Sequence, residues 1–74
     1  SMAISYDKLW KKLRDNKMKK TDLIKKASIS SNVLARMGRE EPVSLESMEK
    51  VCKLFHCGIG DVMEFIEASK NTDE

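Results

Sequence analysis

The chain has 74 residues and a net charge of +2, which is enough sequence for one small core and too little for a second domain. Charged residues make up 35% of the chain and hydrophobic residues 41%, so the composition is that of a folded domain rather than a disordered segment. No apolar run approaches the roughly 20 residues that span a bilayer, and the start lacks the pattern of a signal peptide. We therefore expect a cytoplasmic protein with no membrane partner.

The small net charge hides an uneven distribution along the chain. Residues 1–39 hold 11 Lys and Arg against 3 Asp and Glu, a balance of +8, whereas residues 40–74 hold 3 against 9, a balance of −6. A basic half beside an acidic half indicates a polyanionic partner on one side of the domain. The alternative is a solvated lysine-rich surface with no partner.

The first predicted helix covers residues 6–16 and follows Ser5, whose hydroxyl can cap its free amide groups. Asp7 lies near the N-terminal end of this helix, where a carboxylate is stabilising. The apolar residues recur at the helical period and are expected to face the core: Tyr6, Leu9, Trp10 and Leu13. In such a stripe, Trp10 is more typical of a core anchor than of a ligand-stacking residue.

Residues 20–37, KTDLIKKASISSNVLARM, predict two short helices joined by a tight turn. Their inward side chains are Leu23, Ile24, Ala27, Ile29, Leu34 and Met37. The second helix, residues 30–37, starts at Ser30, whose hydroxyl can cap it. Its outward face carries Ser31, Asn32, Ala35 and Arg36. A helix with short or forked hydrogen-bonding groups on one face fits a DNA major groove and can contact base edges there.

The loop at residues 38–42 changes the direction of the chain. Gly38 follows the second helix directly and is expected to end it as a left-handed cap. Arg39 can contact a phosphate, since DNA-binding domains position themselves by such backbone contacts; the alternative is a plain polar turn. Glu40 and Glu41 are expected to face away from DNA or to limit non-specific binding.

Ser44 is expected to cap a fourth helix over residues 45–55, with an apolar stripe of Leu45, Met48, Val51, Cys52 and Phe55. A fifth helix is expected to start at Gly60-Asp61, and no β-strand pattern is evident. That last helix is apolar on more than one side, through Val62, Met63, Phe65 and Ile66, which indicates a second buried surface and hence a homodimer.

Cys52 and Cys57 are interpreted as free thiols in a reducing cytoplasm rather than as a disulfide. Together with His56 they bring three potential metal ligands close in sequence, but no second cluster exists to complete a zinc site. We expect no metal, no cofactor and no small-molecule ligand. The single histidine lacks a nucleophile or carboxylate partner and there is no glycine-rich phosphate loop, so an enzyme is not expected.

Two stretches carry a family resemblance. MKKTDLIKKASISSNVLARM resembles the core of the XRE family of phage-repressor-like helix-turn-helix regulators, and VSLESMEKVCKLFHCGIGDVMEF resembles its fourth helix, loop and fifth helix. The short chain also resembles the stand-alone VanU-type regulators beside vancomycin-resistance operons. The resemblance implies an all-α fold, a compact five-helix bundle with a central helix-turn-helix. Where the family usually has Gly in the turn, this chain has Ser28, which must take a positive φ or rearrange the turn.

The resemblance also implies site residues. Ser31, Asn32 and Arg36 stand where the family places base-reading side chains, and Lys20 and Ser30 where it places phosphate contacts. Arg39 is added as a phosphate contact by its local chemistry. Lys19 and Lys20 replace the usual Thr-Gln opening of the first of the two helices.

The expected function is a sequence-specific transcriptional regulator that binds a double-stranded DNA operator as a homodimer. An antitoxin or protein-interaction adaptor of the same fold is the alternative, since the acidic half offers a protein-binding surface. DNA binding is favoured because the basic charge and the reading helix coincide. The expected domain covers residues 4–69, with a remnant of tag removal and a tail at 1–3 and a frayed tail at 70–74.

Overall fold

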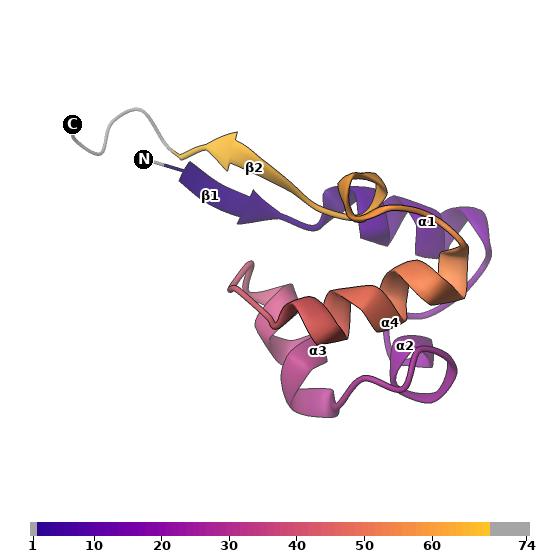
Figure 1. Ribbon diagram of the computed structural model, residues 1–74. Helices are drawn as coiled ribbons and strands as arrows, with labels where there is room; N and C mark the ends of the chain where they lie inside the picture. Colours follow the sequence, from indigo (N-terminus) through magenta and orange to yellow (C-terminus); the bar gives the residue numbers. More distant parts are fainter. Residues whose placement is uncertain (1, 69–74) are drawn as a thin grey trace.

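The computed structural model describes residues 2–68, which form four α-helices and a two-stranded sheet (Figure 1). The elements follow in the order β1 (Met2–Ser5), α1 (Asp7–Asp15), α2 (Asp22–Lys26), α3 (Ser31–Gly38), α4 (Leu45–Phe55), the 3₁₀ turn η1 (Ile59–Asp61) and β2 (Glu64–Glu67). The four predicted helices up to residue 55 are confirmed, whereas the fifth helix and the all-α class are wrong. Ser1 and residues 69–74, which include the predicted C-terminal tail, lie outside the described residues.

Every helix contributes to one hydrophobic core. The buried apolar residues are Tyr6, Leu9, Leu13, Leu23, Ala27, Ile29, Met37, Met48, Val51 and Val62. The predicted inward positions of the helix-turn-helix are therefore confirmed, with Ile24 and Leu34 half-buried beside them. One assignment in α4 is wrong, because Leu45 is 75% exposed. It lies in the first turn of that helix, one turn before the buried Met48, where the core does not reach it.

A short antiparallel sheet stands where the fifth helix was expected. β2 pairs with β1 in the register Met2↔Glu67, Ala3↔Ile66, Ile4↔Phe65 and Ser5↔Glu64. The helix predicted from residue 60 stops as the single turn η1, closed by the carboxylate of Asp61, which accepts a hydrogen bond from the Gly58 amide at 3.1 Å. The expected N-terminal tail thus includes strand residues, and the sheet extends away from the helical body (Figure 1).

Local backbone geometry confirms one sequence prediction and corrects another. Ser28 has a φ of 62°, the positive value expected where related turns use glycine. Gly38, in contrast, is the last residue of α3 and has no positive φ; the left-handed residue of that loop is Glu40, with a φ of 61°. The chain therefore continues two residues further before it reverses, and this brings Glu41 back toward α3.

Candidate nucleic-acid interface

The turn between α2 and α3 is stabilised by buried apolar residues on its inner side and by a lysine of α4 on its outer side. Ala27 and Ile29 flank the turn and are both buried. Between them, Ser28 directs its carbonyl outward, where it accepts a hydrogen bond from the Lys50 ammonium at 3.4 Å. This contact was not expected from sequence, because Lys50 is 22 residues away along the chain. The turn is thus fixed from two sides.

The N-terminal end of α3 presents polar side chains to solvent. The hydroxyl of Ser30 accepts a hydrogen bond from the Val33 amide at 3.1 Å, which confirms the predicted cap. Ser31 and Asn32 follow in the first turn, exposed and without a hydrogen-bonding partner within residues 2–68. The buried Met37 and the half-buried Val33 fix the opposite side of the helix. A rigid helix therefore offers two unengaged polar groups at its N-terminal end.

The start of α2 differs from the expected geometry. α2 begins at Asp22, whose carboxylate accepts a hydrogen bond from the Lys19 amide at 2.8 Å. Thr21 stands at the cap position but makes no side-chain capping bond. Lys20 consequently lies in the turn before α2, with its ammonium 4.3 Å from the centre of the Trp10 ring. This cation–π contact gives the half-buried Trp10 a second role besides core packing.

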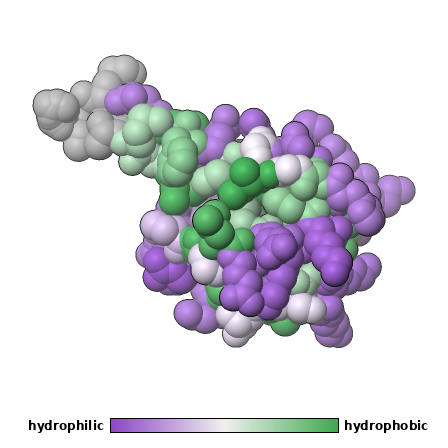
Figure 2. Space-filling view, viewed as in Figure 1, coloured by the Kyte–Doolittle hydropathy of each residue, from purple (hydrophilic) through white to green (hydrophobic). Residues whose placement is uncertain are grey.

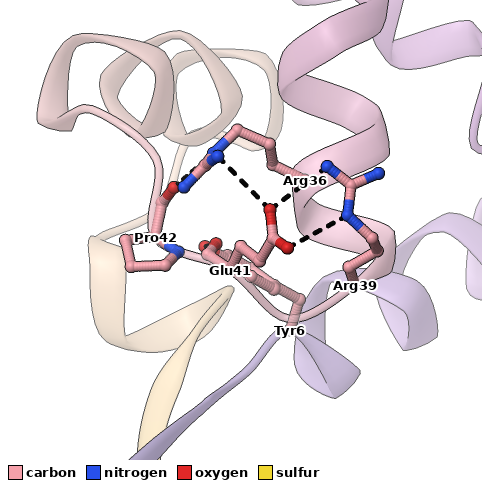
Figure 3. A network of polar contacts seen from close by, with 5 residues as sticks. All are labelled: Tyr6, Arg36, Arg39, Glu41 and Pro42. Atoms are coloured by element: carbon pink, nitrogen blue, oxygen red, sulfur yellow. Dashed lines mark hydrogen bonds and ion pairs between the residues drawn. The ribbon is translucent and has the colours of Figure 1, made fainter.

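The C-terminal end of α3 carries a polar network that connects it to the following loop (Figure 3). The Arg36 Nε donates to the Pro42 carbonyl at 2.9 Å, and its Nη1 lies 3.3 Å from Glu41 Oε1. Arg39 uses two nitrogens on the same carboxylate: Nε donates to Oε2 at 3.0 Å and Nη2 to Oε1 at 3.2 Å. One acidic side chain thus engages both arginines of the predicted site.

Tyr6 anchors the backbone of this loop from below. Its hydroxyl donates a hydrogen bond to the Glu41 carbonyl at 2.7 Å, 35 residues away in sequence. Burial raises the pKa of Tyr6, and the charge of Arg36 opposes that shift. The hydrogen bond from Arg39 holds the pKa of Glu41 below its usual value, with a smaller contribution from the charge of Arg36. The loop therefore has a fixed backbone and an ionised carboxylate.

The six predicted site residues fall into three groups. Ser30, Ser31 and Asn32 lie together at the N-terminal end of α3. Arg36 and Arg39 meet at its other end through Glu41, and Lys20 lies on the α2 side against Trp10. Glu41 was missed as a partner of both arginines. Its position two residues after Arg39 gave only a weak signal, because a carboxylate there reaches that guanidinium only if the loop turns back.

The last turn of α4 and the segment that follows it hold the other group of candidate ligands. Cys52 and Cys57 are free thiols, and with His56 they line a shallow depression. Burial raises the pKa of Cys52, and the neighbouring Cys57 adds to that shift. Within residues 2–68, no three His, Cys, Asp or Glu side chains are placed to hold one metal ion. Nor is any helix in this part of the chain both long and apolar enough to cross a membrane.

A second surface is hydrophobic and concave. Figure 2 shows apolar residues along the sheet and continuing onto the helical body. A groove of about 420 Å³ lies there, lined by Ile4, Tyr6, Pro42, Val43, Leu45, Met48, Ile59, Met63 and Phe65. At its rim, Leu45 is 75% exposed and Phe65 63% exposed. Of the apolar residues predicted to be in excess, Val62 is buried in the core, Met63 lines the groove, and Phe65 and Ile66 are exposed on a strand rather than on a helix.

Comparison with known proteins agrees with this geometry. Residues 8–68 match the family of Cro/C1-type helix-turn-helix DNA-binding domains. Among solved structures, the crystal structure of the transcriptional regulator VanUg, form II, is similar with a TM-score of 0.83 and 38% sequence identity, covering 88% of this chain and 87% of that one. No curated protein sequence matches the chain.

Proposed function

Because this chain belongs to the Cro/C1-type helix-turn-helix DNA-binding family, it is a DNA-binding transcriptional regulator, and we propose that α3 reads an operator through the major groove. The observation that carries this proposal is the N-terminal end of α3, where the side chains of Ser31 and Asn32 are exposed on a capped helix and bind no other group among the described residues. In helix-turn-helix complexes the N-terminal residues of the second helix contact base edges. The similarity to a solved transcriptional regulator supports the same role.

Each site residue then has a proposed contact. The Asn32 amide can bond the edge of an adenine, and the Ser31 hydroxyl can bond either kind of base edge. Arg36 is tied to the loop after α3, which favours a phosphate contact over the base contact that the sequence predicts. Lys20, Ser30 and Arg39 complete the phosphate contacts, because ammonium, hydroxyl and guanidinium groups all bind phosphate oxygens.

We also propose that the regulator acts as a homodimer whose second copy covers the apolar groove. A two-stranded sheet is marginally stable unless further strands or packing cover it. Phe65 and Leu45 expose much of their apolar surface beside that sheet, so a second copy would stabilise the element that lacks cover. A two-fold dimer would match half-sites roughly 34 Å apart.

Sedimentation at micromolar concentration tests the dimer, with Phe65→Ser as the weakened interface and the length of the DNA footprint as a second readout. We expect a wild-type dimer that the substitution dissociates. A wild-type monomer at all concentrations that protects a single half-site excludes the dimer.

The proposal assigns the protein no catalytic role and a cytoplasmic location, where an operator is accessible. An antitoxin or adaptor of the same fold would use the groove and not α3. Binding to non-specific duplex at low salt separates the two, because a basic helix-turn-helix shows at least weak binding there and a pure adaptor shows none.

The sharper test compares Asn32→Ala with Lys20→Ala on an operator obtained by in vitro selection and on a scrambled duplex. Asn32→Ala should cost about 1–3 kcal/mol on the operator and little on the scrambled duplex. Lys20→Ala should weaken both by similar factors and lower the salt slope by about one unit. Equal losses on both duplexes for Asn32→Ala would show that α3 is not the sequence-reading helix.

A further inference from the structure

Glu41 occupies one of the two forked edges through which the Arg39 guanidinium can bind a phosphate. Its two carboxylate oxygens take the Nε and Nη2 of that guanidinium at 3.0 and 3.2 Å. Such an edge binds carboxylates and phosphates alike in a bidentate manner. A phosphate that approaches Arg39 in the same way therefore meets an edge that is already engaged.

The same carboxylate also reduces the charge available from Arg36. Its Oε1 lies 3.3 Å from Arg36 Nη1, while the Nε of that residue is bound to the Pro42 carbonyl. Two cationic side chains at the end of α3 thus share one internal anion. The local electrostatic attraction for DNA is smaller than the number of arginines suggests.

The backbone around Glu41 keeps the carboxylate near these arginines. The Glu41 amide donates to the Arg36 carbonyl at 2.9 Å, and its own carbonyl accepts from the Tyr6 hydroxyl at 2.7 Å. Both main-chain groups of the residue are therefore fixed. Only the side-chain torsions are left to move, so the carboxylate can swing away from Arg39 without unfolding the loop.

We propose that Glu41 is an internal phosphate mimic that limits the affinity of the protein for DNA of any sequence. This inference rests on the proposed DNA-binding function. A backbone phosphate displaces the carboxylate from Arg39 on binding, and the ion pair that is lost offsets part of the gain. Because phosphates are the same in every duplex, Glu41 lowers affinity for all sequences and leaves base discrimination to the N-terminal end of α3.

The neighbouring residue provides a matched control. Glu40 is exposed, carries the same charge and makes no ion pair within residues 2–68. Glu40→Gln and Glu41→Gln therefore change the net charge equally, but only the second releases the two arginines. Binding of each variant to a random-sequence duplex is measured by fluorescence anisotropy across a salt series. Thermal melts confirm that both variants are folded.

Glu41→Gln should bind the random duplex about fivefold more tightly than Glu40→Gln at low salt, with a salt slope about one unit steeper. Glu41→Asp is the second variant, since it keeps the net charge while its shorter side chain cannot reach both guanidinium groups. It should bind more tightly than the wild type.

Equal or weaker binding of Glu41→Gln relative to Glu40→Gln overturns the inference. If Glu41→Gln does not fold, Glu41→Asp decides, and binding no tighter than wild type overturns it. In either case, measurable binding by the wild type leaves the proposed function intact. If neither the wild type nor any variant binds duplex at low salt, the DNA-binding proposal fails and the role of Glu41 fails with it.

Discussion

The hydrogen bond from Tyr6 to the Glu41 carbonyl allows a test of what holds the loop after α3. Tyr6→Phe removes the hydroxyl and keeps the buried ring, so the core packing is unchanged and the carbonyl loses its donor. A typical intramolecular hydrogen bond contributes about 1 kcal/mol, and an acceptor left unsatisfied in a partly buried site costs at least as much. We therefore expect the free energy of unfolding to fall by about 1–1.5 kcal/mol.

This loss is large enough to measure in a chain of this size. At about 2.1 cal/mol/K per residue, 74 residues have an unfolding entropy of about 0.16 kcal/mol/K, so 1 kcal/mol lowers the Tm by about 6 °C. Thermal and urea unfolding followed by circular dichroism give both quantities. Thr21→Val is the matched control, because it removes an exposed hydroxyl that makes no capping bond. If Tyr6→Phe is as stable as Thr21→Val, the hydroxyl does not anchor the loop.

The remaining predictions concern two caps and a thiol. Ser30→Ala and Ser44→Ala should each lower the free energy of unfolding by about 1 kcal/mol, since each hydroxyl caps a helix. Only Ser30→Ala should also weaken DNA binding. If the two variants bind DNA with equal affinity, Ser30 is not part of the interface. Burial raises the pKa of Cys52, so its thiol should react slowly in the folded protein. In a Cys57→Ser background at pH 8, alkylation of Cys52 by iodoacetamide should be slower in the folded protein than in urea. Equal rates would show an accessible thiol of ordinary acidity. Because of the same shift, the Cys52 thiol loses its proton at a lower pH in the unfolded chain than in the folded protein. The contribution of Cys52 to stability should therefore decline as the pH rises above the ordinary pKa of a thiol. A series of Tm measurements against pH checks this.

The sequence was sufficient to predict features that depend on residues close together in the chain. The cap at Ser30 follows from the residue type, and the positive φ at Ser28 is one of the two outcomes that the family resemblance implies for a turn without glycine; both are confirmed. The exposed face of α3 follows from the period of the half-buried Leu34 and the buried Met37, which leaves the opposite positions exposed. These features lie within one supersecondary unit.

Sequence was insufficient where a residue is stabilised by a distant one. The sequence predicted a helix at β2 because the residues around Phe65 and Ile66 are compatible with either a helix or a strand. The partner strand, which decides between the two, lies near the other end of the chain. The Gly38 cap was wrong because the helix closes two residues later, where the Glu40 and Glu41 amides donate to the Met37 and Arg36 carbonyls at 3.0 and 2.9 Å. The Tyr6 hydroxyl then holds the Glu41 carbonyl from a distant part of the chain. No local sequence pattern predicts a hydrogen bond between two residues that are 35 positions apart in the chain.

The pairing of β1 with β2 also determines the order in which parts of the protein can form. The nearest pair, Ser5 and Glu64, closes a segment of about 60 residues, and at about 0.6 kcal/mol per doubling of length this costs about 2 kcal/mol more entropy than a turn of about four residues. Pairing between four residues on each strand does not by itself stabilise the sheet enough to offset this entropy. Only when α1 and α4 have already packed are the strands near enough to pair. We therefore expect the sheet to form after the helical body, with amide hydrogens among the first to exchange with solvent.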